Sequence, residues 1–277
     1  MIGKKTKHTL LMATTVMAGA LSSCTDKLEP GFIGKHEIKI ESGRMTPEAL
    51  WAMGRIGGMS VSPDNSTIAY GVSYYSVPEN KSHRVLYTMD AKGKHQRMLT
   101  TTTANEGDAV WIKGGTKLAF LSNASGSNQL WEMNPDGSDR RQLTNTEKSL
   151  EGFAFSPDES KVLLVMTVQN GPSTVDKHPD LPLTTGRVIN DLMYKHWDEW
   201  VDEIPHPFLA DFDGNTVTNP RDILEGELYE SPMRPFGGME QFAWSPDGKT
   251  IAYTCRKKRG AEYAKSTDSD IYLYNIE

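Results

Sequence analysis

The residues best suited to chemistry form an acidic group in the segment 187–203. Asp198 and Asp202 lie four residues apart, as do Glu199 and Glu203. An amphipathic helix would place these carboxylates on one side, and its other side would be apolar at helical spacing: Ile189, Met193, Trp197 and Trp200. Paired carboxylates can hold an ammonium group, because charge-assisted hydrogen bonds are strong. The alternative interpretation is a solvated acidic face beside a packed tryptophan edge.

Neither a catalytic group nor a metal site is indicated elsewhere in the sequence. There is no Gly-x-Ser-x-Gly nucleophile elbow, so no serine nucleophile can be assigned. His196, Asp198 and His206 match no spacing typical of zinc ligands. We therefore expect no catalytic residue, no metal and no cofactor in this chain.

Composition and charge narrow the class of protein. The formal net charge is -6, and nucleic-acid binding is not expected because phosphate recognition needs a basic face. The chain has 24 Gly and 15 Pro, with aromatic residues throughout. This mixture favours an all-β protein with many turns.

Residues 1–23 have the pattern of a lipoprotein signal peptide. A lysine-rich start precedes a short apolar stretch, Thr9 to Leu21, and small residues precede Cys24. The end of this segment resembles a bacterial lipobox, which implies cleavage before Cys24 and lipid attachment to its thiol. Residues 24–44 would then be a tether, and the protein would be lipid-anchored in the periplasm or at the outer membrane of a Gram-negative bacterium. An ordinary signal peptide with an incidental cysteine is the alternative.

A repeated turn organises the rest of the chain. Ser-Pro-Asp occurs at Ser62, Ser156 and Ser245, and each copy is followed by an apolar run; 112–115 is a degenerate copy. Pro fixes one corner of such a turn, and Asp can bond its own backbone. The alternating apolar residues on both sides are typical of half-buried strands. Units of four strands at a period of about 45 residues have the size of a propeller blade.

The sequence thus predicts an all-β fold: a partial propeller of about four blades, each of four antiparallel strands, with one helical insertion. A short helix from Pro47 to about Arg55 precedes it. The predicted blades over residues 45–277 are 56–103, 104–147, 148–227 with insertion 169–204, and an incomplete 237–277. The sequence ends in the third strand of the last blade, and an open arc of blades implies a piece of something longer.

With these repeats placed, the sequence resembles the N-terminal part of the prolyl oligopeptidase family of serine peptidases. Bacterial dipeptidyl-peptidase and acylaminoacyl-peptidase-like enzymes are the most similar branch. The resemblance rests on Met45–Trp51, Arg55, Val61–Asp64 and Asp191–Trp200. It implies a propeller that screens the active site of a separate α/β-hydrolase domain and admits only short peptides. The triad of that domain has no counterpart here, so we expect this chain alone to be inactive.

The resemblance also implies a role for the acidic insertion. In family members an acidic residue on a helical propeller insertion can hold the free amino terminus of the substrate, and Glu199, then Asp198, are the candidates here. The expected partners are short peptides and, through the lipid anchor, a membrane. The alternative function is a non-enzymatic, TolB-like propeller lipoprotein that acts as a periplasmic protein-binding module.

Overall fold

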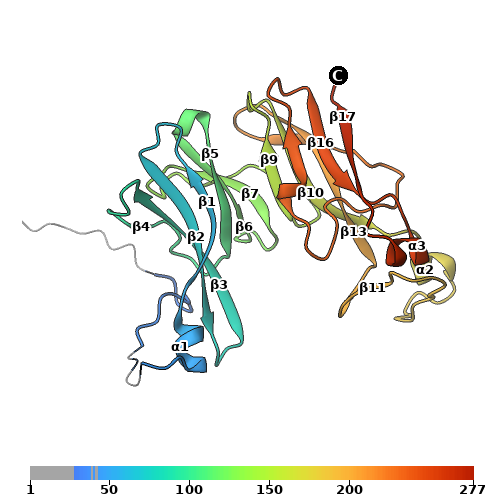
Figure 1. The fold of residues 1–277 in the computed structure, drawn as a ribbon, viewed down its shortest axis with the longest axis horizontal. Coiled ribbons are helices and arrows are strands. Elements are labelled where there is room, and N and C mark those ends of the chain that lie inside the picture. Colours follow the sequence, from blue (N-terminus) through green and yellow to red (C-terminus); the bar gives the residue numbers. More distant parts are fainter. Residues whose placement is uncertain (1–27, 39, 41–42) are drawn as a thin grey trace, which may run out of the picture.

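The structure is a computed structural model that describes residues 28–38, 40 and 43–277. Its main elements are four antiparallel sheets that follow one another along the chain (Figure 1). The predicted signal peptide, 1–23, and Cys24 lie outside the described residues. Within the described ranges, no helix is both long and apolar enough to span a bilayer.

Consecutive strands are neighbours in each sheet. The first sheet contains β1 (Arg55–Val61), β2 (Thr67–Ser76), β3 (Lys81–Asp90) and β4 (Arg97–Met98), and the second contains β5 (Glu106–Ile112), β6 (Lys117–Ser122), β7 (Gln129–Met133) and β8 (Arg141–Gln142). The third contains β9 (Gly152–Phe155), β10 (Lys161–Gln169), β13 (Glu203–Phe212) and β14 (Val217–Asp222), and the fourth contains β15 (Phe242–Trp244), β16 (Thr250–Cys255) and β17 (Asp270–Asn275). The predicted all-β fold with four-stranded antiparallel blades is confirmed.

The Ser-Pro-Asp turns close each first hairpin by local hydrogen bonds. The hydroxyl of Ser62 donates to Asp64 at 2.6 Å and accepts the backbone N–H of Thr67 at 2.9 Å. The same two bonds recur at the turns that begin with Ser156 and Ser245. Hydrogen bonds from the Ser160 backbone and from the hydroxyls of Ser156 and Ser160 lower the pKa of Asp158 to about 2. A charged aspartate is thus part of each turn.

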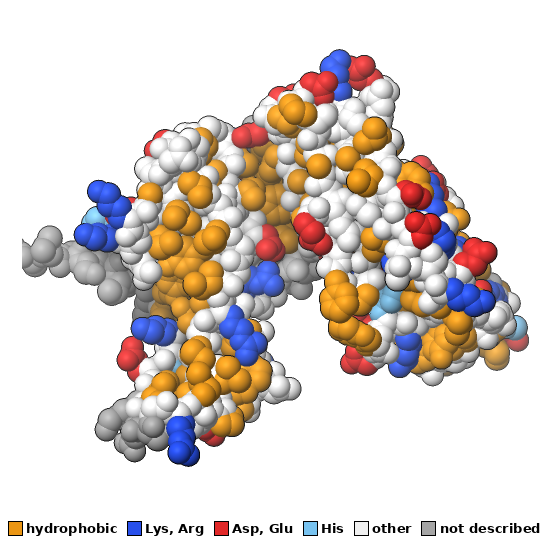
Figure 2. Space-filling model, viewed as in Figure 1, with side chains coloured by type: hydrophobic (Ala, Val, Ile, Leu, Met, Phe, Trp, Pro, Cys, Tyr) orange, Lys and Arg blue, Asp and Glu red, His pale blue; other side chains and the backbone are white. Residues whose placement is uncertain are grey.

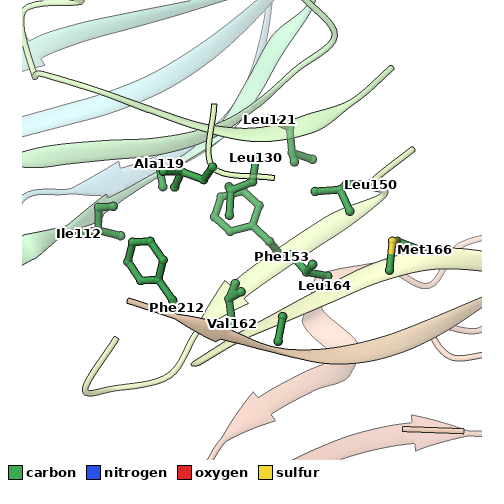
Figure 3. Packing of buried hydrophobic residues seen from close by; sticks show 12 residues of the cluster. Ile112, Ala119, Leu121, Leu130, Leu150, Phe153, Val162, Leu164, Met166 and Phe212 are labelled. Carbon is green, nitrogen blue, oxygen red and sulfur yellow. The ribbon is translucent and has the colours of Figure 1, made fainter. Parts of the chain in front are cut away.

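Apolar side chains fill the space between neighbouring sheets. Between the second and third sheets, Leu121, Leu130 and Leu150 meet Phe153, Leu164 and Phe212 (Figure 3). A smaller cluster joins the first sheet to the second through Leu86 and Phe120, and another joins the third to the fourth through Leu209 and Ile251. Each sheet is therefore held by the face of the next, as in adjacent blades of a propeller.

Tryptophan side chains add a polar link at two of these interfaces. Trp111 Nε1 donates to the carbonyl of Ser60 at 3.1 Å, and Trp244 Nε1 donates to the carbonyl of Ala154 at 3.2 Å. Both tryptophans precede a turn and reach the first strand of the preceding sheet. Phe155 occupies the corresponding position in the third sheet and has no N–H to donate.

The predicted helix over 187–203 is wrong. The insertion instead contains a short helix, α2 (Thr174–Lys177), and a hairpin of β11 (Lys195–His196) and β12 (Glu199–Trp200). Trp197 has a φ of 51°, which is incompatible with a right-handed helix. Arg187 stacks over Trp200 at 4.3 Å, so the apolar residues find partners other than their helical neighbours.

The segment before the first sheet is partly docked. Thr46 caps α1 (Pro47–Ala52) by accepting the N–H of Ala49, so the predicted helix start is confirmed, although the helix ends before Arg55 opens β1. Within the predicted tether, 24–44, the side chain of Ile33 is buried against the first sheet. The remaining short helices are η1 (Lys113–Gly115), η2 (Met239–Gln241) and α3 (Gly260–Lys265).

Replacing Leu164 by Ala tests whether the contact between sheets carries the fold. Leu164 is fully buried between the second and third sheets, so the cavity should lower the free energy of unfolding by about 3 kcal/mol. Urea denaturation followed by circular dichroism measures this. Leu183→Ala is the matched control, because its side chain is 94% exposed and the change should be near zero. Equal effects at the two positions would contradict the assigned interface.

Candidate functional site

The two predicted amine-binding residues lie together at the tip of the β11–β12 hairpin. His196 pairs with Glu199 and Lys195 with Trp200, so Trp197 and Asp198 form a two-residue turn. Asp198 and Glu199 are both exposed. The turn presents adjacent carboxylates to solvent, although a hairpin and not a helix carries them.

The other two acids of the predicted group are held in ion pairs. Arg187 bonds both carboxylate oxygens of Asp202, with Nη2 at 2.6 Å from Oδ2 and Nε at 3.1 Å from Oδ1. Glu203, at the start of β13, forms an ion pair with Lys148 and accepts a hydrogen bond from the hydroxyl of Thr167. The structure therefore separates the four acids into two with fixed cationic partners and two, Asp198 and Glu199, at the hairpin tip.

Arg234 connects the hairpin to the third sheet. Its guanidinium pairs with Glu151, and Nη1 lies 4.0 Å from Oε2 of Glu199. Burial raises the pKa of Glu151; Arg234 opposes this rise, and the carboxylates of Glu199 and Glu203 add to it. Arg234 thus lies between two carboxylates, those of Glu151 and Glu199, and its single positive charge leaves the surroundings of Glu199 favourable for a further cation.

A buried carboxylate beneath the hairpin was missed by sequence reasoning. Glu230 is only 5% exposed; it accepts the hydroxyl of Tyr263 and the backbone N–H of Arg234, and its Oε2 lies 3.4 Å from His196 Nε2. Burial raises the pKa of the Tyr263 phenol, and the hydrogen bond to Glu230 raises it further. Glu230 therefore ties β11 to α3 and the fourth sheet. No spacing in the sequence relates these three segments.

The two histidines considered for a metal lie in different environments. His196 faces Glu230, whereas His206 Nδ1 lies 2.8 Å from Asp222. Across the described part of the chain, no cluster of three or more His, Cys, Asp or Glu residues has the arrangement of a metal site.

Comparison with known proteins agrees with this architecture. Residues 40–189 match the family described as TolB beta propeller domain. The chain belongs to this β-propeller family. It is also 50% identical over 232 residues to dipeptidyl-peptidase 5 of Porphyromonas gingivalis, and 42% identical over 236 residues to dipeptidyl-peptidase 5 of Porphyromonas endodontalis. The resemblance to the dipeptidyl-peptidase branch of the prolyl oligopeptidase family is confirmed.

The propeller covers only part of these relatives. The matches take in 84% and 85% of this chain but 34% of each Porphyromonas protein. Among solved structures, an acylaminoacyl peptidase of Pyrococcus horikoshii matches with a TM-score of 0.56 at 11% identity, over 82% of this chain and 32% of that one. At this identity the structural match supports the fold alone. The propeller is therefore similar to the propeller region of these enzymes.

Replacing Arg234 by Met tests its role between Glu151 and Glu199. The ion pair lowers the pKa of Glu151, so its loss raises that pKa further above the unfolded value. A raised carboxyl pKa means that the folded state binds more protons, so stability falls as pH rises through the folded pKa. Arg234→Met should therefore lower the melting temperature more at about pH 8 than at about pH 5.

Glu151→Gln in the same background separates this effect from a loss of packing. The double variant removes the titrating group, so the extra loss of stability at high pH should disappear. Thermal melts across the pH range give the comparison directly. A destabilisation that is the same at every pH, in both variants, would contradict a charge-based role for Arg234.

Proposed function

We propose that this chain is the substrate-gating propeller of a serine dipeptidyl peptidase that cleaves short peptides. The 50% identity over most of the chain to a dipeptidyl-peptidase 5 is the observation that carries the proposal. The absence of a nucleophile elbow from the sequence agrees with a division of labour in which another domain breaks the bond. The propeller's role would then be selection and positioning of the substrate.

Glu199, assisted by Asp198, is the proposed anchor for the free amino group of the peptide. Both carboxylates are exposed at the end of the hairpin and can reach an ammonium ion without leaving water completely. Arg234 lies on one side of Glu199 and leaves its other side open to a second cation. An anchor at a fixed distance from the scissile bond is what an enzyme needs to remove two residues at a time.

Lipid attachment at Cys24 belongs to the same proposal. It would hold the peptidase at a membrane that faces the periplasm. The support is the signal-peptide pattern over residues 1–23, with its small residues directly before the cysteine. Metabolic labelling with a radioactive fatty acid tests the attachment. The unaltered protein should incorporate the label, and the Cys24→Ala variant should not.

Kinetics of the full-length peptidase test the amine anchor. Glu199→Gln removes the charge but keeps the shape, and it should raise KM for dipeptidyl coumarylamides with a free amino terminus roughly tenfold or more. Glu79→Gln is the matched control, because Glu79 is an exposed glutamate in the hairpin between β2 and β3. Acetylated substrates, which carry no ammonium, should respond equally to both substitutions.

Two results would overturn the proposal. If Glu199→Gln leaves KM for free-amine substrates unchanged, the anchor lies elsewhere. If the purified full-length protein hydrolyses no dipeptidyl substrate, the function is that of a non-enzymatic binding module. The 277-residue chain alone should be inactive in either case.

A further inference from the structure

A group of basic side chains lies at the turn between β3 and β4. Lys92, Lys94, His95 and Arg97 are all exposed there. Figure 2 shows Lys and Arg side chains gathered around a histidine beside the β4 edge of the first sheet. Asp90 closes the turn by accepting the backbone N–H groups of both lysines, and its other oxygen contacts the ring of His95. Within the described part of the chain, no ion pair holds the two ammonium groups, so they can meet an anion from outside.

The repeat shows that the fold does not require these cations. The turn at 134–138 of the second sheet is closed by the same two backbone hydrogen bonds as the turn of the first. Lys92 therefore corresponds to Asp136, and Lys94 corresponds to Ser138. The second sheet makes its turn with an acid and a hydroxyl where the first has two cations. The backbone of the turn needs neither lysine, and both are available for an external partner.

The segment that leads back to Cys24 docks beside this turn. The backbone N–H of Glu29 donates to the carbonyl of Thr101 at 3.0 Å, and the Glu29 carboxylate accepts the backbone N–H of Thr103 at 2.5 Å. Hydrogen bonds from the backbone and side chain of Thr103 lower the pKa of the Glu29 carboxyl, so this link persists at neutral pH. Thr101 follows Arg97 on the edge strand β4 by four residues. The docked segment and the basic turn thus belong to one edge of the first sheet.

Covalent geometry keeps a lipid on Cys24 close to that edge. Cys24 precedes Glu29 by five residues, which span at most about 18 Å when fully extended. The four residues from Arg97 to Thr101 span at most about 14 Å. A bilayer that holds acyl chains on Cys24 therefore lies next to the edge of the first sheet that carries the basic side chains.

We propose that Lys92, Lys94 and Arg97 form a membrane-contact surface that binds the anionic lipid headgroups of the bilayer in which Cys24 is anchored. The inference goes beyond the proposed function and rests on its lipid attachment. The formal net charge of the chain is -6, so most of its surface is repelled by an anionic bilayer, and a local basic group decides which edge faces it. Each Lys or Arg near such a bilayer adds to the attraction, and a lipid chain with a basic group anchors more firmly than the lipid chain alone.

Vesicle binding by the mature full-length protein, from residue 24 onward and with Cys24→Ala, tests the surface without help from the lipid. The protein should co-sediment with phosphatidylglycerol vesicles and not with phosphatidylcholine vesicles, and Lys92→Ser/Lys94→Ser should weaken this binding roughly tenfold or more. Lys177→Ser/Lys265→Ser is the matched control, because it removes the same charge from exposed positions elsewhere. Equal binding by the two double variants would overturn the proposal. Displacement by inorganic phosphate beyond the effect of chloride at equal ionic strength would also overturn it, since that result identifies a site for a single phosphate.

Two further measurements separate this inference from the proposed function. Fatty-acid labelling reports the attachment at Cys24, and hydrolysis of dipeptidyl substrates reports the peptidase, whose activity Lys92→Ser/Lys94→Ser should leave unchanged. If the label or the activity is absent but the vesicles still distinguish the two double variants, the proposed function fails in that respect and the headgroup contact stands. If the label is incorporated and both double variants bind equally, the contact surface fails and the attachment stands.

Discussion

The burial of each sheet's apolar face against the next sheet is the interaction on which the structure depends. Leu164 and Phe153 can leave water only because Leu121 and Leu130 lie opposite them on the neighbouring sheet. A single antiparallel sheet of this size could not cover both faces by itself. The contacts between sheets come mainly from the strands, so the insertion between β10 and β13 and the loop before η2 lie outside the main core. The candidate site is built on these two segments.

Much of this stack of sheets could be predicted because the turns between its strands are stabilised by local hydrogen bonds. The hydroxyl of Ser156 and the carboxylate of Asp158 bond within a few residues of their own position, so the turn is visible in the sequence itself. The strand after this turn is visible as a continuous apolar run, Val162 to Met166, and all five side chains are buried because both faces of the third sheet are covered by neighbouring sheets. Arg234 and Glu151 form an ion pair although they are 83 residues apart in the sequence, and no local pattern in the sequence predicts such a contact.

The insertion could not be predicted because its stabilising contacts are distant in sequence. Helical spacing of Ile189, Met193 and Trp197 suggested one apolar side, yet Trp197 packs on Phe236 from another segment. Asp202 is held by Arg187, and the backbone at Trp197 adopts a positive φ. Amphipathic periodicity identifies a helix only when the apolar residues share one partner surface. The sequence did identify Asp198 and Glu199 as exposed neighbours, because adjacency survives the change from helix to hairpin.

The position of those carboxylates depends on a residue that never reaches the surface. Glu230 accepts a hydrogen bond from the hydroxyl of Tyr263 on α3, and it lies beside His196 on β11. His196 is the cross-strand partner of Glu199. A carboxylate that is 5% exposed is costly to leave without partners, so the hairpin and α3 are held in register by the need to satisfy it. The fourth sheet thereby contributes to a site that lies on the insertion of the third. A propeller insertion that was supported by its own sheet alone would place the same acids with less precision, since only contacts from two directions fix the tilt of a two-residue-strand hairpin.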